Sequence, residues 1–446
     1  MAHPSTPLSP LGPGYRRLLG AAILGNLGDG IALVALPWYT ATLTGDPVAV
    51  AAVAAAGRLP WLGALVAGAV GDRMDRRRLM VRAGLGKALV LVVLCALIAV
   101  DAAGVPVVVA AALLIGVCEV FFDNTAQSLM PMVVPRGRLE RANGMLWSAE
   151  EIASRFVGAP LAGVLVAVSA AAAFGAQALL VVGAVAALLA LRGDFSPAPA
   201  PSGPAASLGA MVAEGARWLW RHRLLRTLAV VLALSNLAAS MNAAVLVLFA
   251  RDVLGMGAAG FGLLLTAVSG GMVLGAQVVH RLVPLVPPGV TLAGALAVQG
   301  GGYLLVGLAQ QVWVFAVCFV AVGFFMIWWN VLTVSLRQRI VPDHLLSRVL
   351  AAYRTVGWGT APVGALAAGA LAAALEPVVG RVWALSAPFL AAGVLSAALV
   401  AVSAVGLTTR SIRAAEAAAG TGGGSGGQRR STGSQSSPEA VDPSSP

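Results

Sequence analysis

Long apolar runs, which charged residues rarely interrupt, constrain this chain more than any other feature of its sequence. Hydrophobic residues make up 59% of its 446 residues and charged residues only 11%, whereas about 25% of the residues in a soluble domain are charged. A helix that crosses a bilayer needs about 20 mostly apolar residues, so the runs predict an all-α integral membrane protein. Twelve spans are predicted, at residues 17–43, 49–71, 79–101, 105–130, 142–168, 170–192, 224–251, 258–282, 289–309, 311–337, 346–372 and 380–407.

The arginines divide the loops between these spans into two sets. They gather at every second loop, from Arg16 to Arg413, while the intervening short loops carry only Arg251 and Arg381. Because loops rich in Lys and Arg stay in the cytoplasm, both termini are predicted to be cytoplasmic and the number of spans to be even. This placement also accounts for the net charge of +11 without a nucleic-acid partner. The first run is too long for a signal peptide and is predicted to be kept as a span.

Two halves of six spans each are predicted, joined by a polar linker. A shift of about 207 residues places Asp29 on Asn236 and Pro135 on Pro342, which indicates an internal repeat. The linker begins with a Pro- and Ser-rich stretch that cannot hold a helix, and an interfacial amphipathic helix with its arginines toward lipid headgroups follows it. The predicted parts are a flexible N-terminus (1–16), an N-terminal half (17–192), a cytoplasmic linker (193–223), a C-terminal half (224–407) and a disordered cytoplasmic tail (408–446).

A compact cluster of charge lies between the second and third spans, at residues 68–78. It resembles the signature loop between helices two and three of the major facilitator superfamily. Asp75 stands where that family has a Gly, and a left-handed turn there would cost an Asp residue some energy. The family's residues are matched at five positions, which are Gly68, Asp72, Arg73, Arg76 and Arg77.

The resemblance implies twelve transmembrane helices in two pseudo-symmetric six-helix halves, with substrate bound between the halves near the bilayer midplane. It also implies a gating role for this loop, in which Asp72 approaches the positive N-terminal end of span eleven. The alternative is that the arginines only hold the loop inside and contact anionic lipid.

Further strings resemble one branch of the superfamily, the drug:proton antiporters that include macrolide-efflux and enterobactin-exporter-type proteins. The strings lie within residues 26–30, 121–143, 214–225 and 338–349. Gly158, Pro160 and Gly163 in span five are similar to the Gly-Pro antiporter motif of exporters. This resemblance implies a proton-coupled exporter in the plasma membrane.

Placing an acidic residue inside a membrane span costs free energy, so each such residue is expected to act as a proton relay, as a countercharge for the substrate or in a structural ion pair. At 1.5 Å of rise per residue, Asp29 lies roughly 18 Å from the cytoplasmic end of its span and Arg58 at a similar depth. An Asp29–Arg58 pair is therefore geometrically possible. Asp29 would take up a proton when the pair opens and lose it when Arg58 approaches; a permanent structural salt bridge is the alternative.

Four more charged residues are proton-coupling candidates on spans four and five. Glu119 and Asp123 are four residues apart and share a helical face, and Glu119 has no partner on its own helix. Glu151 and Arg155 could form a local pair. The alternative interpretation is that Glu151–Arg155 and an Asp123–Arg141 pair are charge clamps between helices.

The second half lacks comparable acids within its spans, and it carries aromatic residues instead. Aromatic residues in the middle of helices more often pack or form an interfacial belt than bind a ligand. They could also offer apolar surface to a bulky lipophilic substrate. The substrate-cavity candidates are Asn26, Phe325, Trp328, Trp329, Asn330 and Arg354.

Patterns typical of enzymes are lacking in this sequence. It has no phosphate-binding Gly-rich loop with a Lys, and its histidines and cysteines have no metal-binding spacing. We therefore expect no catalysis, cofactor or metal, and a monomer whose partners are protons, lipids and a small lipophilic molecule. The predicted function is a proton-coupled exporter of lipophilic drugs or antibiotic-like metabolites. The alternatives are a siderophore exporter, which cationic residues such as Arg337 and Arg354 facing the cavity would favour, and a non-transporting membrane sensor or scaffold.

Overall fold

The computed structural model describes residues 12–71, 73–135, 138–193, 195–196, 208–282 and 285–423, and every regular element in these ranges is a helix. The N-terminal half contains α1 (Pro13–Leu43), α2 (Pro47–Arg58), η1 (Leu59–Gly63), α3 (Ala64–Gly71), α4 (Arg76–Ala99), α5 (Val105–Val133), α6 (Leu139–Glu151), η3 (Ile152–Gly158), α7 (Ala159–Val168) and α8 (Ala170–Leu189). The linker helix α9 (Leu208–Arg221) follows. The C-terminal half contains α10 (Arg223–Leu248), η4 (Phe249–Val253), α11 (Ala258–Leu264), α12 (Thr266–Leu282), α13 (Pro288–Ala309), α14 (Val312–Ile340), α15 (Asp343–Gly359), α16 (Ala361–Gly406) and α17 (Thr409–Gly423).

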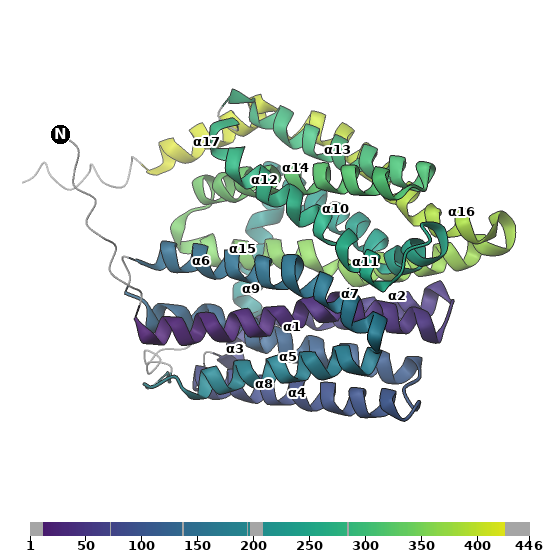
Figure 1. Ribbon diagram of the computed structural model, residues 1–446. Coiled ribbons are helices and arrows are strands. Elements are labelled where there is room, and N and C mark those ends of the chain that lie inside the picture. Colours follow the sequence, from purple (N-terminus) through teal and green to yellow (C-terminus); the bar gives the residue numbers. More distant parts are fainter. Residues whose placement is uncertain are drawn as a thin grey trace, which may run out of the picture.

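Helices long and apolar enough to cross a bilayer recur along both halves (Figure 1). Within the described ranges there are ten such segments, and the last, Arg348–Gly406, is long enough for two spans. The chain turns inside it at Gly380, whose φ of 78° is one that glycine adopts without steric cost. The segment α2–η1–α3 supplies the remaining span. The predicted twelve-helix, two-half architecture is confirmed.

Several spans contain short irregular turns. The second span changes from α2 to the 3₁₀ helix η1 just before Pro60, which cannot donate the backbone hydrogen bond of an α-helix. Two π-helical turns, η3 and η4, lie in the fifth and seventh spans. Such turns are rare and occur frequently at functional sites.

Asp75 begins α4 without a left-handed turn. Its φ is −56°, and its carboxylate accepts a hydrogen bond from the backbone N–H of Arg78 at 2.7 Å. Asp75 is therefore the N-cap of α4, a role that favours Asp. The energetic cost expected for Asp at this position does not arise.

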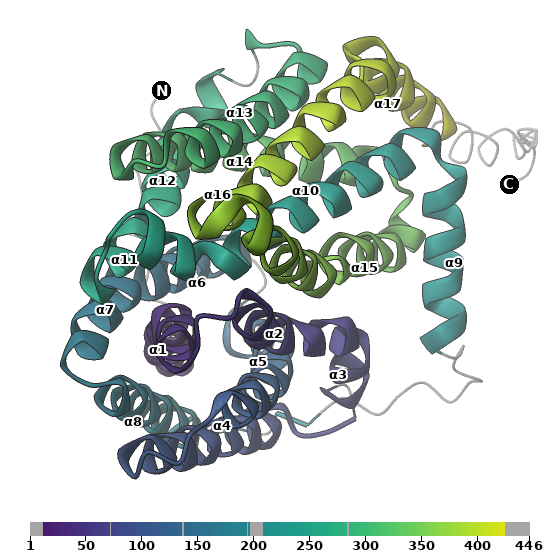
Figure 2. The same cartoon turned by 90° about the vertical axis from the view of Figure 1, so that its right-hand side faces the viewer.

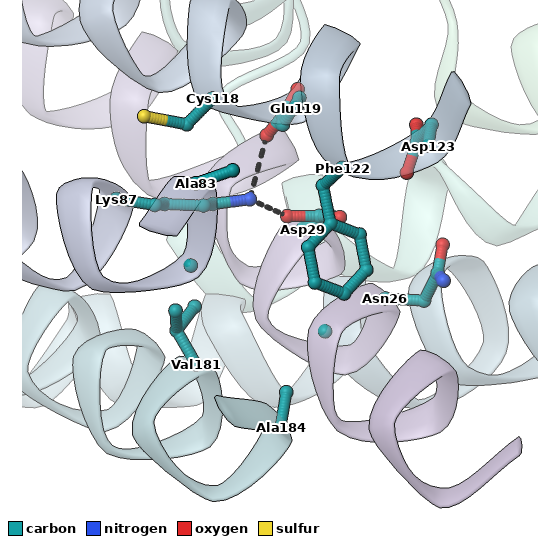
Figure 3. Close-up of a pocket in the computed structure, with 12 residues that line it drawn as sticks. Asn26, Asp29, Ala83, Lys87, Cys118, Glu119, Phe122, Asp123, Val181 and Ala184 are labelled. Atoms are coloured by element: carbon teal, nitrogen blue, oxygen red, sulfur yellow. Dashed lines mark hydrogen bonds and ion pairs between the residues drawn. The ribbon is translucent and has the colours of Figure 1, made fainter. Parts of the chain in front are cut away.

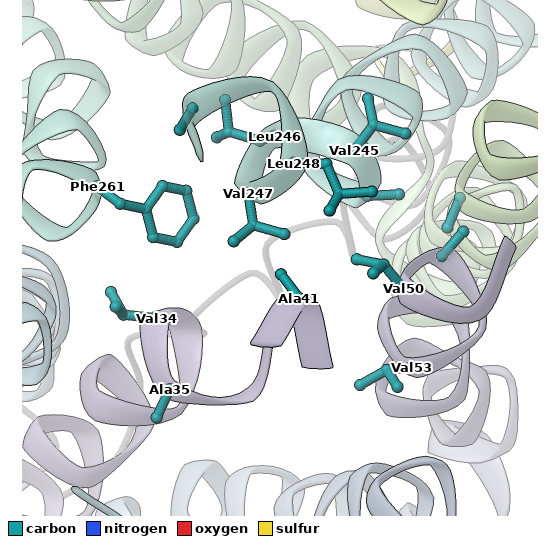
Figure 4. Close-up of a cluster of buried hydrophobic side chains, with 14 of the residues drawn as sticks. Val34, Ala35, Ala41, Val50, Val53, Val245, Leu246, Val247, Leu248 and Phe261 are labelled. Carbon is teal, nitrogen blue, oxygen red and sulfur yellow. The ribbon is translucent and has the colours of Figure 1, made fainter. Parts of the chain in front are cut away.

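The two halves pack against each other most extensively where α2 contacts α16 and α7 contacts α11 (Figure 2). Around the loop that joins α1 to α2, an apolar cluster fills the interface between the halves (Figure 4). Ala41 and Val50 face Val247 and Leu248 of α10, and each is 2% exposed or less. We call this end of the bundle the far end, since α1 begins and α17 lies at the opposite end (Figure 1).

The linker and tail predictions meet the structure only in part. The helix predicted near residues 207–223 is present as α9, which runs across the direction of the spanning helices (Figures 1 and 2). Leu219 is buried against the protein, whereas Arg217 and Arg221 are exposed. Residues 197–207 and 424–446 lie outside the described residues.

The structure differs from the predicted disordered tail over residues 409–423, which form α17. The hydroxyl of Thr408 accepts a hydrogen bond from the N–H of Ser411, and Arg339 pairs with Glu416 at 3.1 Å. These contacts and an alanine-rich sequence with high helix propensity explain the difference. At the other terminus α1 already begins at Pro13, inside the segment predicted to be flexible.

Candidate functional site

A lysine lies between two carboxylates inside the N-terminal half, and the three side chains come from three different helices (Figure 3). The ammonium group of Lys87 on α4 donates to Asp29 Oδ1 on α1 and to Glu119 Oε1 on α5, the second bond measuring 2.8 Å. The Lys87 side chain is only 8% exposed. We call these residues the Asp29–Lys87–Glu119 cluster. Ionised side chains within a membrane span are rare, usually paired, and mark ion or substrate pathways.

Each member of the cluster lies near the middle of its helix. Asp29 falls in the middle of α1, Lys87 in the middle of α4 and Glu119 in the middle of α5. Since each helix is long enough to cross a bilayer, these positions place the cluster near the midplane. A midplane site is far from both aqueous surfaces, so its ionic contacts are weakly screened.

A small cavity of about 30 Å³ adjoins the cluster. Asn26, Phe122 and Asp123 line it together with the three cluster residues (Figure 3). A water molecule needs roughly 10–15 Å³ of such volume and two to four polar partners, and this cavity provides both. Asn26, a substrate-cavity candidate, thus lies beside the charged cluster, although its amide donates to the Ala22 carbonyl of its own helix at 2.9 Å.

Asp123 adds a third carboxylate, one helical turn beyond Glu119. It interacts electrostatically with Asp29, Glu119 and Lys87, but among the described residues it makes no ion pair. The predicted Asp123–Arg141 clamp is therefore not formed. One ammonium group faces three carboxylates, so the site carries more negative than positive charge when all four groups are ionised.

The partner of Asp29 differs from the predicted one. Asp29 pairs with Lys87, whereas Arg58 interacts electrostatically with Glu119 and Arg155. The depth of a residue in its span does not give the direction in which its side chain leaves the helix. Sequence reasoning missed Lys87 although a signal was available, because it is the only lysine of the chain and lies in the middle of an apolar span.

The helix that carries Asp29 is pressed against the π-helical turn η3. A Cβ atom on Gly30 would lie 2.1 Å from the Ser154 carbonyl oxygen and 2.8 Å from the Gly158 Cα atom, so only glycine fits there. Gly158 belongs to the proposed antiporter motif, and Pro160 stands at the start of α7 directly after it. The motif therefore contacts the helix of the charged cluster.

Two contacts lead from this region to the other half. A Cβ atom on Gly163 would lie 2.6 Å from the Ala258 carbonyl oxygen of α11. Glu151 pairs with Arg155 at 3.0 Å, as predicted, and it also accepts a hydrogen bond at 2.9 Å from Ser269 of α12. The second contact crosses between the halves and was not predicted.

The arginines of the charged loop bind neighbouring helices of the same half. Arg76 donates to Ser128 of α5 at 3.2 Å. Arg77 donates to the carbonyl groups of Leu188 and Leu189 at the end of α8, at 3.1 and 2.6 Å. Gly68 lies in α3 and Arg73 is exposed, while Asp72 lies outside the described residues.

The aromatic candidates of the C-terminal half are largely packed. Trp328 and Trp329 are only 6% and 8% exposed, and Trp328 contacts Phe325 with ring centroids 5.6 Å apart. Asn330 and Arg354 are exposed. The buried tryptophans support the packing interpretation, and the role of these residues in binding substrate stays a prediction.

Twelve spans in two halves, with buried charge at the midplane of one half, define a membrane transporter of the major facilitator fold. Solved structures share this fold. The nucleoside transporter NupG aligns with a TM-score of 0.68 at 12% identity, covering 89% of this chain and 99% of its own. A bacterial homologue of the iron transporter ferroportin, in an inward-facing state, aligns with a TM-score of 0.68 at 15% identity, covering 88% and 100%.

The chain belongs to the major facilitator family described as "Transmembrane secretion effector", whose profile matches residues 5–417. It is similar to the multidrug efflux pump Tap of Mycolicibacterium fortuitum, with 28% identity over 398 residues that cover 85% of this chain and 94% of that protein. Tap of Mycobacterium tuberculosis H37Rv is 28% identical over 388 residues, covering 81% and 87%.

Proposed function

We propose that this protein exports lipophilic drugs or antibiotic-like metabolites in exchange for protons. The observation that carries the proposal is the Asp29–Lys87–Glu119 cluster at the midplane of the N-terminal half. The efflux pumps to which the chain is similar support a drug as the substrate. The predicted orientation, with both termini in the cytoplasm of a plasma-membrane protein, belongs to the same proposal.

Proton binding would change which helices Lys87 connects. With both carboxylates ionised, Lys87 joins α1, α4 and α5. A proton on Asp29 removes the charge that attracts Lys87, which then stays with Glu119 and releases α1. Because α1 packs directly against η3, and η3 adjoins the Glu151–Ser269 contact, the release would bias the packing between the two halves. A population shift of this kind follows from the different proton affinity of the two states.

The carboxylate of Asp123 supports the proposal that this site binds a proton or a cationic drug. This carboxylate, which makes no ion pair within the described residues, lines the cavity beside the cluster and would add negative charge there when ionised, which a proton or the cationic group of a drug would neutralise. The proton and the drug would then compete for the same carboxylates. Such competition is the simplest way to exchange one for the other.

The alternatives draw less support from the contacts. A siderophore exporter would need cationic side chains in its cavity. Of the two candidates, Arg354 is exposed, but Arg337 is buried and stacks on Tyr353 at 4.0 Å from the ring centroid. A sensor or scaffold would not need Asp29 and Glu119 to exchange protons.

Inside-out vesicles with an internally acidic proton gradient provide the test, followed with a pH-sensitive dye while lipophilic cations, macrolides and siderophores are added. We expect a lipophilic drug to dissipate the gradient with the wild type and with Asp101→Asn, but not with Asp29→Asn. Asp101 is an exposed acid of the same half and is the matched control. A gradient that Asp29→Asn dissipates as fast as the wild type would refute the role of Asp29. Coupling to siderophores alone, or no movement of any labelled compound, would favour the respective alternative.

A further inference from the structure

An arginine of the C-terminal half binds the end of a helix of the N-terminal half, at the far end of the bundle. Arg251 lies in the π-helical turn η4. Its Nε and Nη2 atoms donate to the two oxygens of Asp252, at 2.6 and 3.3 Å, and its Nη1 atom donates to the backbone carbonyl of Ala41. Since a guanidinium group is planar, the two hydrogen bonds to Asp252 fix the direction of the remaining N–H group.

Asp252 is in turn held by a second arginine. Arg381, directly after the turn at Gly380, donates to Asp252 Oδ2 at 2.8 and 3.1 Å. Its third nitrogen binds both oxygens of Glu376, at 3.0 and 3.2 Å. Two cations and two anions therefore form a neutral network, which we call the Arg251–Glu376 network. All four side chains belong to the C-terminal half.

The carbonyl that Arg251 binds lies in the last turn of α1, which ends at Leu43. The last four carbonyls of a helix lack partners within the helix, and the helix dipole makes this end negative. An arginine is well suited to cap it. The unusual feature is that the cap comes from the opposite half of the protein.

We propose that Arg251 is a positioning residue that keeps the far end of the bundle closed by capping α1 across the two halves. The apolar cluster around Ala41 and Val247 lies beneath this contact and excludes water. Opening the far end separates α1 from η4, so the bond to Ala41 must break. The bonds among Arg251, Asp252, Arg381 and Glu376 survive, because these residues move together. The network thus presents the same capping group again when the halves close.

The test measures how readily the far end opens, and it needs neither substrate nor proton gradient. The three natural cysteines are replaced, and Val247, which is 0% exposed, is changed to Cys. A membrane-impermeant maleimide is applied from the side on which a separate Val378→Cys variant reacts, since Val378 is 80% exposed near Gly380. Arg251→Ala should raise the labelling rate of Val247→Cys roughly tenfold, as expected for the loss of one charge-assisted hydrogen bond. Arg251→Lys should give an intermediate rate, because a single ammonium group cannot form the planar pair of bonds to Asp252.

Glu376→Gln is the matched control. It removes a charge from the same network but leaves the bond to Ala41, so its labelling rate should stay close to that of the wild type. Equal rates in Arg251→Ala and the wild type, or an equal rise in Glu376→Gln, would overturn the proposal. If Arg251→Ala is not monodisperse in size-exclusion chromatography, Arg251→Gln takes its place and is judged by the same comparison.

Discussion

Replacing Lys87 by methionine tests the cluster most directly. Methionine keeps most of the length of the side chain and removes its charge, which leaves Asp29 and Glu119 facing each other. In the structure the ammonium group contacts both carboxylates and its side chain is 8% exposed. The variant therefore separates the ionic contribution of Lys87 from its packing.

The size of the effect follows from these contacts. Unit charges 4 Å apart attract each other with about 4 kcal/mol at an effective dielectric constant of 20. Breaking a buried ion pair by removing one partner typically costs about 3–5 kcal/mol, because the other charge stays buried without compensation. We expect Lys87→Met to lower the free energy of unfolding by about this amount. Adding Glu119→Gln should restore about 0.5–3 kcal/mol, which is the usual coupling between residues in contact.

Unfolding can be followed by titrating SDS into protein in mild detergent while recording tryptophan fluorescence. Arg82→Met is the matched control, since Arg82 is an exposed cation on the same helix, and it should change stability by less than about 0.5 kcal/mol. If Lys87→Met costs no more than Arg82→Met, or if Glu119→Gln adds to the loss instead of relieving it, Lys87 does not compensate two buried carboxylates and the reasoning fails.

Two further predictions concern the packing of α1 and the charged loop. Gly30→Ala should abolish transport and lower stability by about 1–3 kcal/mol, because its methyl group would push α1 away from η3. Gly20→Ala should be tolerated, because Gly20 has open space around it. Equal transport by both variants in the vesicle assay would contradict this prediction. Asp72→Asn should reduce transport without reducing the amount of protein in the membrane, since the gating role depends on its charge, and unchanged transport at normal abundance would rule that role out.

Hydropathy and arginine placement were sufficient to predict the architecture. The runs from residue 17 to residue 407 coincide with the helices because a bilayer requires both a minimum length and an apolar surface. What these signals do not contain is the interruption of individual spans. No pattern used in the sequence analysis predicts the π-helical turns η3, at Ile152–Gly158, and η4, at Phe249–Val253.

The site was predicted only in part, for a related reason. Asp29 and Glu119 stood out because acids are costly in spans, and both are in the cluster. Their partner was missed because hydrophobic periodicity, which normally gives the orientation of a helix, is weak in the alanine-rich spans of this chain. Without that orientation, depth alone pointed to Arg58 as the partner of Asp29, and Lys87 was not considered.

The composition of the chain makes its charged cluster unusually accessible to spectroscopy. Lys87 is the only lysine among 446 residues, so protein grown with ¹⁵N-labelled lysine would carry a single side-chain nitrogen signal. That one signal would come from the ammonium group between Asp29 and Glu119, without any substitution or attached probe. Its chemical shift, recorded at different proton concentrations and with added drugs, would report directly which carboxylate Lys87 contacts in each state of the transport cycle.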